Sequence, residues 1–289
     1  ASGDTFRVVD ETSGRLIGTV DRARAFEQVH PGAIYLHQGE PYLIRRLDLT
    51  ARLASAAATE ADYYTQPRSE TQLDVLSVQR QRPWGLTTVC WGEVEVATQV
   101  LGFVRKRLFS EEVLGEEPLD LPEERLRTKA VWLTIPDALD EEVRRLALDL
   151  AGGIHAVEHA AIGLLPLFAM CDRWDLGGVS YPRYPDLGAA AIFIYEGHPG
   201  GVGITDTGYA MLDEWLTATL RTIETCPCEA GCPSCIQSPK CGNLNEPLDK
   251  HAAIVLLRGL LVRDGTPPAP QAEAQRTGGR RVPRHRRHR

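Results

Sequence analysis

The sequence predicts an α+β protein, with an N-terminal β-rich small barrel or bent sheet followed by an α-rich domain with a short sheet. Three observations carry this prediction. Strand-like runs separated by turn residues dominate residues 6–136, an apolar helical period begins at Asp137, and five cysteines fall within residues 226–241. We therefore expect a β-rich platform domain at 1–136, an α-rich cysteine-cluster domain at 137–265 and a disordered Pro/Arg-rich tail at 266–289.

The N-terminal region is expected to be mostly sheet. A hairpin is predicted at residues 32–44, because two strand-like runs flank Gln38-Gly39-Glu40. Helix signals are confined to residues 22–27 and 49–57. The remaining strands are expected at 6–9, 16–20, 73–78, 87–100, 103–106 and 130–135.

Helices are expected to dominate after residue 136. Asp137 is a suitable N-cap, and acidic residues fill the first turn, where the helix dipole favours them. We expect an interruption at Gly152-Gly153, then a helix over 154–170 that is apolar on most faces and central to the core. The elements after it are a strand at 189–195, a helix over 211–223 and a helix over 248–263.

Composition and charge narrow the class of protein. The 289 residues are 43% apolar, yet no run approaches the ~18–20 uninterrupted apolar residues of a membrane span, and no leader opens the chain. We therefore expect no membrane partner and a cytoplasmic location, in a fragment of a longer protein. The net charge is −7, and seven arginines without an acid at 276–289 leave −14 for the rest. An acidic body argues against a protein that grips phosphates with its whole surface.

The cysteine cluster is the strongest chemical signal. Cys232-Pro-Ser-Cys235 has the two-residue gap that lets two thiolates face one ion, and four thiolates complete the shell of a structural zinc. We expect the ligands to be Cys226, Cys228, Cys232 and Cys235, with Cys241 as the substitute if Cys226 or Cys228 points away. Iron–sulfur ligation and free thiols are the alternatives.

A second motif, His155-Ala-Val-Glu158-His159, matches the inverted zinc-hydrolase pattern. Two histidines four residues apart share a helix face, as two metal ligands must. A third ligand would come from Glu196, Glu214 or Glu224. The other interpretation is a set of hydrogen-bonded polar groups in a buried helix, and we favour it.

The glycine-rich segment 197–203 could cradle a phosphate, but a tight strand-to-helix connection is the favoured interpretation. No phosphate-binding Gly-x-x-x-x-Gly-Lys-Ser/Thr motif occurs in the chain. The sequence itself therefore gives no argument for nucleotide hydrolysis by this chain.

Several motifs occur together and in order, and as a set they resemble one family. The chain is similar over about residues 137–263 to the C-terminal cysteine-cluster domain of superfamily-two DNA helicases of the MrfA and SftH type, and the preceding β-rich segment resembles the region before that domain. The motifs are Gly153-Ile-His155-Ala-Val-Glu158-His159, Cys171-Asp172-Arg-Trp-Asp175-Leu-Gly177-Gly178, Tyr195-Glu196-Gly-His-Pro199-Gly200-Gly201, the cysteine cluster, Pro239-Lys-Cys241-Gly-Asn243 and Pro247-Leu248-Asp249-Lys250.

The resemblance implies the accessory region of an ATP-dependent 3′–5′ helicase that acts on single-stranded DNA in DNA repair. ATP and Mg²⁺ would bind only in motor domains N-terminal to Ala1 of the same polypeptide, and Cys226, Cys228, Cys232 and Cys235 match the family's zinc site. The family has Tyr-Asp before Pro-Gly-Gly, where this chain has Tyr195-Glu196.

By charge, the expected DNA contacts are Arg45, Arg46, Arg105, Lys106 and Arg107, with Tyr35, Tyr63 or Trp91 as stacking faces. A module that guides DNA or clamps the motor domains is the leading hypothesis. A zinc hydrolase that uses His155, Glu158 and His159, and a protein-docking module, are the alternatives.

Overall fold

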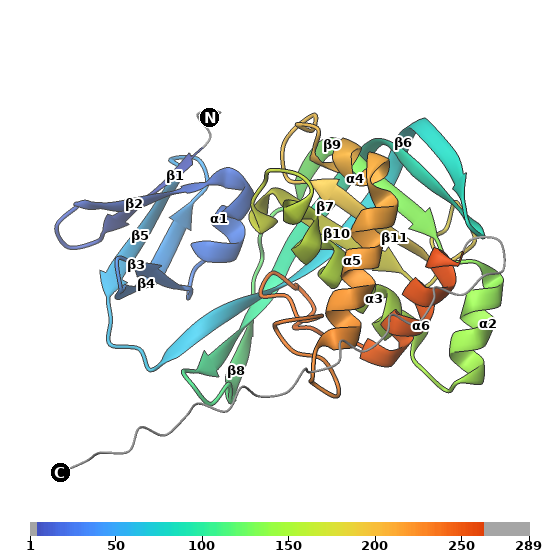
Figure 1. Ribbon diagram of the computed structural model, residues 1–289. Helices are drawn as coiled ribbons and strands as arrows, with labels where there is room; N and C mark the ends of the chain where they lie inside the picture. Colours follow the sequence, from blue (N-terminus) through green and yellow to red (C-terminus); the bar gives the residue numbers. More distant parts are fainter. Residues whose placement is uncertain (1–4, 263–289) are drawn as a thin grey trace, which may run out of the picture.

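Residues 5–262 of the computed structural model form two β-sheets and a set of helices (Figure 1). The smaller sheet comes from the first 58 residues. Its elements are β1 (Thr5–Asp10), β2 (Leu16–Asp21), α1 (Arg22–Gln28), β3 (Ile34–His37), β4 (Glu40–Asp48) and β5 (Leu53–Ala58). The strand order is β2-β1-β5-β4-β3, with β1 and β5 parallel and the other neighbours antiparallel. Its core also takes in Val100 and Leu121 from later in the chain.

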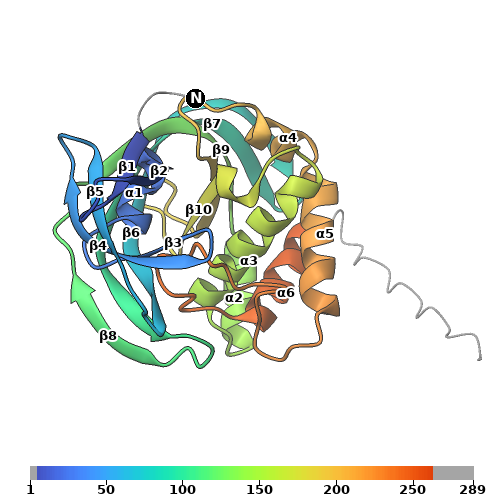
Figure 2. The same ribbon diagram turned by 90° about the vertical axis from the view of Figure 1, so that its left-hand side faces the viewer.

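The larger sheet has strand order β10-β11-β9-β7-β6, with β8 paired to β7. Its strands are β6 (Tyr63–Trp84), β7 (Thr87–Arg107), β8 (Val113–Pro118), β9 (Glu124–Thr134), β10 (Leu176–Tyr181) and β11 (Ala191–Glu196). The β6–β7 hairpin contains three register shifts. Because bulges bend and twist strands, the long strands curve along their length (Figure 2).

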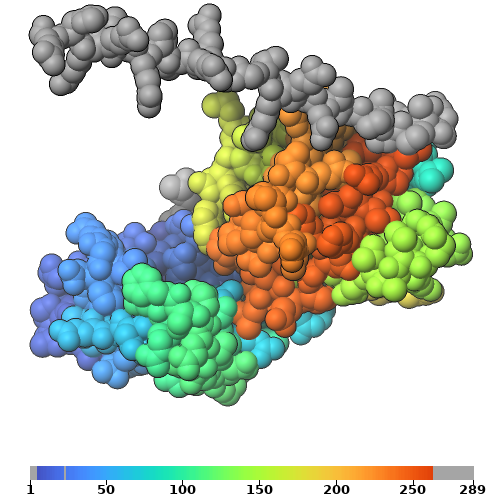
Figure 3. Space-filling model, turned by 60° about the horizontal axis from the view of Figure 1, so that its bottom comes forward, coloured from blue at the N-terminus to red at the C-terminus, as the bar shows by residue number. Residues whose placement is uncertain are grey.

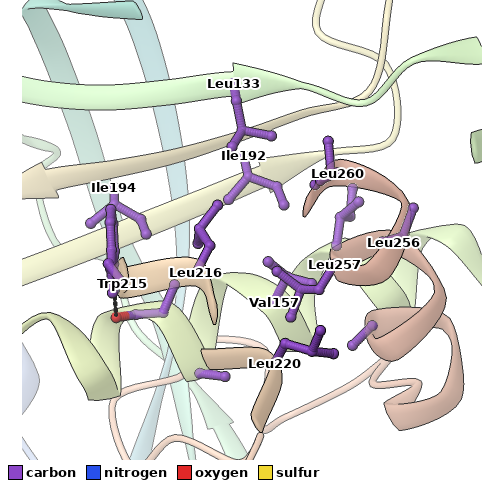
Figure 4. Packing of buried hydrophobic residues seen from close by; sticks show 14 of the residues in the cluster. Leu133, Val157, Ile192, Ile194, Trp215, Leu216, Leu220, Leu256, Leu257 and Leu260 are labelled. Carbon is purple, nitrogen blue, oxygen red and sulfur yellow. Dashed lines mark hydrogen bonds between the residues drawn. The ribbon is translucent and has the colours of Figure 1, made fainter. Parts of the chain in front are cut away.

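Helices pack on one face of the larger sheet. They are α2 (Asp137–Arg145), α3 (Leu150–Leu164), α4 (Ile204–Ala210), α5 (Leu212–Thr225) and α6 (Lys250–Leu261). Leu133, Ile192 and Ile194 from the strands face Trp215 of α5 and Leu257 of α6 (Figure 4). The indole Nε1 of Trp215 donates to the carbonyl of Ala161 in α3 at 2.9 Å, so this buried ring is also satisfied as a donor.

The predicted α+β class is confirmed, and the short helix expected at 22–27 is α1. The helix expected at 49–57 is wrong, because residues 53–58 form strand β5 between β1 and β4. The alanine-rich segment favours a helix by propensity. However, Ala54 and Ala56 are fully buried in the core of the small sheet, and tertiary packing overrides the local preference.

The interruption expected at Gly152-Gly153 is also wrong. Both glycines lie inside α3, and the helical run breaks earlier, between α2 and α3 at residues 146–149. A Cβ at Gly153 would lie 2.6 Å from the Cβ of Ala252, on α6. The glycine therefore lets two helices approach closely.

Replacing Gly153 with alanine is expected to lower the free energy of unfolding by about 1–3 kcal/mol, the usual cost of overpacking. Gly163→Ala is the matched control in the same helix. There the new Cβ would meet only the mobile end of Arg173, and alanine favours the helix by roughly 1 kcal/mol. Chemical denaturation of both variants measures the difference. Equal stabilities would show that α3 and α6 do not depend on this close contact.

Strands from both sides of residue 136 pair with each other, since β9 lies beside β11. The division of the chain into domains at that position stays a prediction. The expected tail at 266–289 lies outside the described residues.

One segment of the described chain, Leu150–Leu167, has the length and mean hydropathy of a membrane-spanning helix, although it contains His155, Glu158 and His159. Two thirds of it (67%) is buried inside the protein. That burial is typical of a core helix.

Candidate metal centre

Four cysteine sulfur atoms converge in the loop between α5 and α6, which Figure 3 shows in orange beside the red α6. The Sγ–Sγ distances are 3.5 Å for Cys226–Cys232 and Cys228–Cys235, 3.6 Å for Cys226–Cys228 and 3.8 Å for Cys232–Cys235. A tetrahedral shell with Zn–S bonds of about 2.3 Å separates its sulfurs by roughly 3.8 Å. The sulfurs therefore have the spacing of a closed tetrahedral zinc shell.

A tight backbone turn holds two of these cysteines in place. The carbonyl of Cys232 accepts hydrogen bonds from the amides of Cys235, Ile236 and Gln237, and the Cys232 amide donates to Cys235 Sγ at 3.3 Å. Gly231, just before the turn, has a φ of 112°, where a side chain is strained. A Cβ there would also lie 2.4 Å from Cδ1 of Ile236. The Gly-Cys-Pro-Ser-Cys segment is thus suited to this turn.

Lys250 supports the cluster from the first turn of α6. Its ammonium donates to the carbonyls of Cys226 and Cys228 at 2.8 and 2.6 Å and contacts Cys228 Sγ at 3.4 Å. The residue is only 6% exposed. Four thiolates around a divalent ion carry a net charge of −2, which a buried ammonium partly offsets. Lys250 ends the Pro247-Leu248-Asp249-Lys250 motif, but its role at the cysteines was not predicted from the sequence.

Cys241 lies outside the four-sulfur group. Its Sγ is 3.5 Å from Nε2 of His155, and the ligand atoms of His155, His159 and Cys241 all lie within 4.8 Å of one another. Because Cys226 and Cys228 both face the four-sulfur group, the substitute role expected for Cys241 is not needed there.

The glutamate of the hydrolase-like motif points elsewhere. Glu158 packs against Gly178 of β10, and burial raises the pKa of its carboxyl to about 8. Burial, with a smaller effect of the neighbouring His155, lowers the pKa of His159 to about 3, so that imidazole is neutral. Within the described chain, no glutamate joins His155 and His159 in a close group of ligand atoms.

None of the three glutamates expected to supply a third metal ligand joins the two histidines. These glutamates are Glu196, Glu214 and Glu224. Glu224 is paired with Arg258 at 2.6 Å, and Glu214 is exposed. The buried carboxylate of Glu196 accepts from Thr205 N at 2.9 Å, from Thr205 Oγ1 at 2.8 Å and from the amide of Val202. It thereby fastens the glycine-rich segment between β11 and α4, as a tight connection requires.

The basic residues expected to contact DNA fall into two groups. Arg45 and Arg46 are exposed on β4, and within the described chain neither is paired with a carboxylate. The three cations of β7 are each paired with an acid. The pairs are Arg105–Glu117 at 2.9 Å, Lys106–Glu111 at 3.9 Å and Arg107–Asp62 at 2.7 Å.

The aromatic residues expected to stack on DNA bases differ in how far their rings are covered by other side chains. Trp91 is covered by the guanidinium of Arg80, 4.4 Å from its ring centroid, and by Lys129 at 5.3 Å. Tyr63 is half-buried at the start of β6. Tyr35 lines a cavity of about 300 Å³ between the small sheet, β6 and the loop after the cysteines.

Sequence reasoning missed this cavity, which Lys240 and Trp174 also line. The ammonium of Lys240 lies 5.2 Å from the ring centroid of Trp174, and burial lowers the pKa of Lys240 to about 8. No local signal identifies the cavity, because its walls come from four distant segments.

Comparison with known proteins adds independent information. The family model of the MrfA Zn-binding domain matches residues 157–236. The chain is 33% identical over 241 residues to an uncharacterized ATP-dependent helicase, YprA, of Bacillus subtilis, covering 82% of this chain and 32% of that protein. It is 41% identical over 111 residues to an uncharacterized protein of Methanocaldococcus jannaschii, covering 37% of this chain and 99% of that protein.

Among solved structures, the crystal structure of the DUF1998 helicase MrfA bound to DNA matches with a TM-score of 0.56 and 28% identity. The match covers 89% of this chain and 34% of that chain. The chain thus spans about a third of the length of each of these two helicases.

Proposed function

Because the chain belongs to the family marked by the MrfA Zn-binding domain, and corresponds to the C-terminal region of a helicase of that type, we propose that it holds a single DNA strand for the motor of its parent protein. The observation that carries this proposal is the match of 89% of the chain to a helicase solved with DNA. We further propose that the parent moves 3′ to 5′ and acts in DNA repair in the cytoplasm.

In this proposal, Cys226, Cys228, Cys232 and Cys235 bind one zinc ion that is structural. Their sulfur spacing supports the assignment. Four thiolates leave no coordination position for water, so this zinc would not activate a hydrolytic water. Its part is to fix the α5–α6 loop, whose Cys/Pro/Gly sequence offers little apolar surface to bury.

The chemistry of ATP belongs to another part of the parent protein. ATP and Mg²⁺ would bind in motor domains of the same polypeptide, which are the first partner of this region. The region described here would contribute strand contacts and would clamp the motor domains.

Arg45 and Arg46 are the best candidates for strand contact. Both are exposed on the small sheet and have no acid to neutralise them in the described chain. The paired cations of β7 would have to exchange a carboxylate for a phosphate, which reduces their gain from binding.

Binding of the 289-residue chain to a labelled oligothymidylate tests this proposal. We expect weak, salt-sensitive binding, because phosphate contacts release counterions. The double variant Arg45→Glu/Arg46→Glu should reduce the slope of log affinity against log salt by about 1.4, since each contact to a single strand contributes about 0.7. Fluorescence anisotropy across a salt series measures it.

The pair Arg144→Glu/Arg145→Glu on α2 is the matched control, because it makes the same charge change at two exposed adjacent arginines. It should leave the slope near the wild-type value. A chain that ends at residue 265 measures the contribution of the arginine tail separately. Absence of any binding at low salt would favour a protein-docking module instead.

A further inference from the structure

A second group of metal-binding side chains lies apart from the four cysteines. His155 and His159 come from consecutive turns of α3, and Cys241 comes from the loop before α6. The two imidazole rings are 4.2 Å apart between centroids. His159 and Cys241 are 5% and 8% exposed, and His155 is half-buried.

The hydrogen bonds of the two histidines fix which nitrogen carries the proton. Nδ1 of His155 lies 2.8 Å from the carbonyl oxygen of Pro247, and Nδ1 of His159 lies 2.8 Å from that of Ile236. A carbonyl oxygen only accepts, so Nδ1 donates in both rings. Each Nε2 of the neutral ring therefore keeps its lone pair. Orientation of a ligating histidine by its other nitrogen is the usual arrangement around protein-bound metals.

The sulfur of Cys241 is prepared as an acceptor as well. The backbone amide of Asn245 donates to Cys241 Sγ at 3.2 Å. The loop is closed by two hydrogen bonds between Ser238 and Asn245, so the position of the sulfur is fixed. Three lone pairs thus converge, and a single thiol proton can satisfy only one of the two histidines.

We propose that His155, His159 and Cys241 form a second zinc site, separate from the four-cysteine centre. Tetrahedral zinc with a Zn–S bond of about 2.3 Å and a Zn–N bond of about 2.05 Å separates sulfur from nitrogen by roughly 3.6 Å. The separation between Cys241 Sγ and His155 Nε2 is 3.5 Å. Imidazole and thiolate together favour zinc over the hard cations magnesium and calcium. The thiol proton is released to solvent when the ion binds.

Three protein ligands leave the fourth position of this zinc for water or for a ligand. Cys241 also lines the 300 Å³ cavity, so one side of the site is near solvent-accessible space. Hydrolysis is not part of the proposal, because Glu158 is turned toward β10. The site accounts for the fifth clustered cysteine, and it makes the two histidines ligands of a metal rather than parts of a catalytic motif.

Metal content of the full chain, equilibrated with zinc and then desalted, tests the proposal. We expect about two zinc ions per chain, and about one in the Cys241→Ala variant, because each of the two groups of ligands holds one ion. Cys90→Ala is the control, since Cys90 is a half-buried cysteine on β7 outside both groups. It should keep both ions. A wild-type content of one ion, unchanged in Cys241→Ala, would overturn the proposal.

X-ray absorption at the zinc edge of the wild-type chain gives a readout that does not require any variant to fold. Two occupied sites predict an average of about 2.5 sulfur and one imidazole nitrogen neighbours per zinc, whereas the four-cysteine site alone predicts four sulfurs. Four sulfurs would refute the second site and leave the first intact. One sulfur with two imidazoles would support the second site and refute the four-cysteine centre.

Discussion

Replacing Cys235 with serine is expected to remove about one zinc ion per chain and to lower the free energy of unfolding by several kcal/mol. The reason is that a structural zinc contributes its binding free energy to folding, about 10–16 kcal/mol in zinc-finger peptides. Cys235 faces the other three sulfurs and, at 5% exposure, also packs in the main core, so the zinc content distinguishes loss of the metal from loss of packing. Metal analysis and chemical denaturation measure the two effects.

Cys171→Ser is the control for the loss of a thiol, because Cys171 lies outside both groups of ligand atoms. It should keep the metal and cost little stability. Treatment of the wild-type chain with a strong chelator should remove the zinc of both sites and lower the free energy of unfolding at least as much as Cys235→Ser does. If the Cys235→Ser variant kept all its zinc and its stability, the four-cysteine centre would be refuted.

The fold class could be predicted because hydrophobic periodicity is a local property. Residues 87–100 read as a strand, and they lie within the 21-residue strand β7. The wrong predictions concern segments whose structure depends on packing against distant parts of the chain. Ala54 and Ala56 belong to a helix-favouring segment that becomes a strand between two neighbours, and Gly153 permits a helix crossing that the sequence does not reveal.

The sequence likewise predicted one part of the candidate site and not the other. Cys226, Cys228, Cys232 and Cys235 lie within ten residues, so their spacing alone indicated that they meet. The similarity to helicases of the MrfA type was also visible in the sequence, and the comparisons confirm it. Cys241 is adjacent to the cluster in sequence, but its neighbour His155 is 86 positions away. No local pattern could have joined them.

The basic residues show a different limit of sequence reasoning. Positive charge alone suggested Arg105, Lys106 and Arg107, but acids on β8 and the loops nearby pair with all three. The sequence shows how many basic side chains there are. Whether each one is free to contact a phosphate depends on which carboxylates the fold brings close to it. Only Arg45 and Arg46 of the five candidates remain exposed and without an acidic partner in the described chain.

The proposed strand contact by Arg45 and Arg46 therefore predicts that their loss slows unwinding by the parent protein without changing its DNA-free ATP hydrolysis. We expect Arg45→Glu/Arg46→Glu in the full-length parent protein to reduce the rate of strand separation by about tenfold, because repulsion replaces two phosphate contacts. ATP hydrolysis without DNA should stay unchanged, since the phosphate-binding motif of such motors does not occur in this chain. The variant would then consume ATP but fail to convert it efficiently into unwinding.

The most direct test of strand holding is the unwinding rate of a duplex with a 3′ single-stranded tail, measured beside DNA-free ATP hydrolysis in the same preparations. The wild-type parent, Arg45→Glu/Arg46→Glu and the control Arg144→Glu/Arg145→Glu are compared at low salt. We expect slow unwinding with unchanged ATP hydrolysis in Arg45→Glu/Arg46→Glu alone. Equal unwinding rates in all three proteins would contradict strand holding by Arg45 and Arg46.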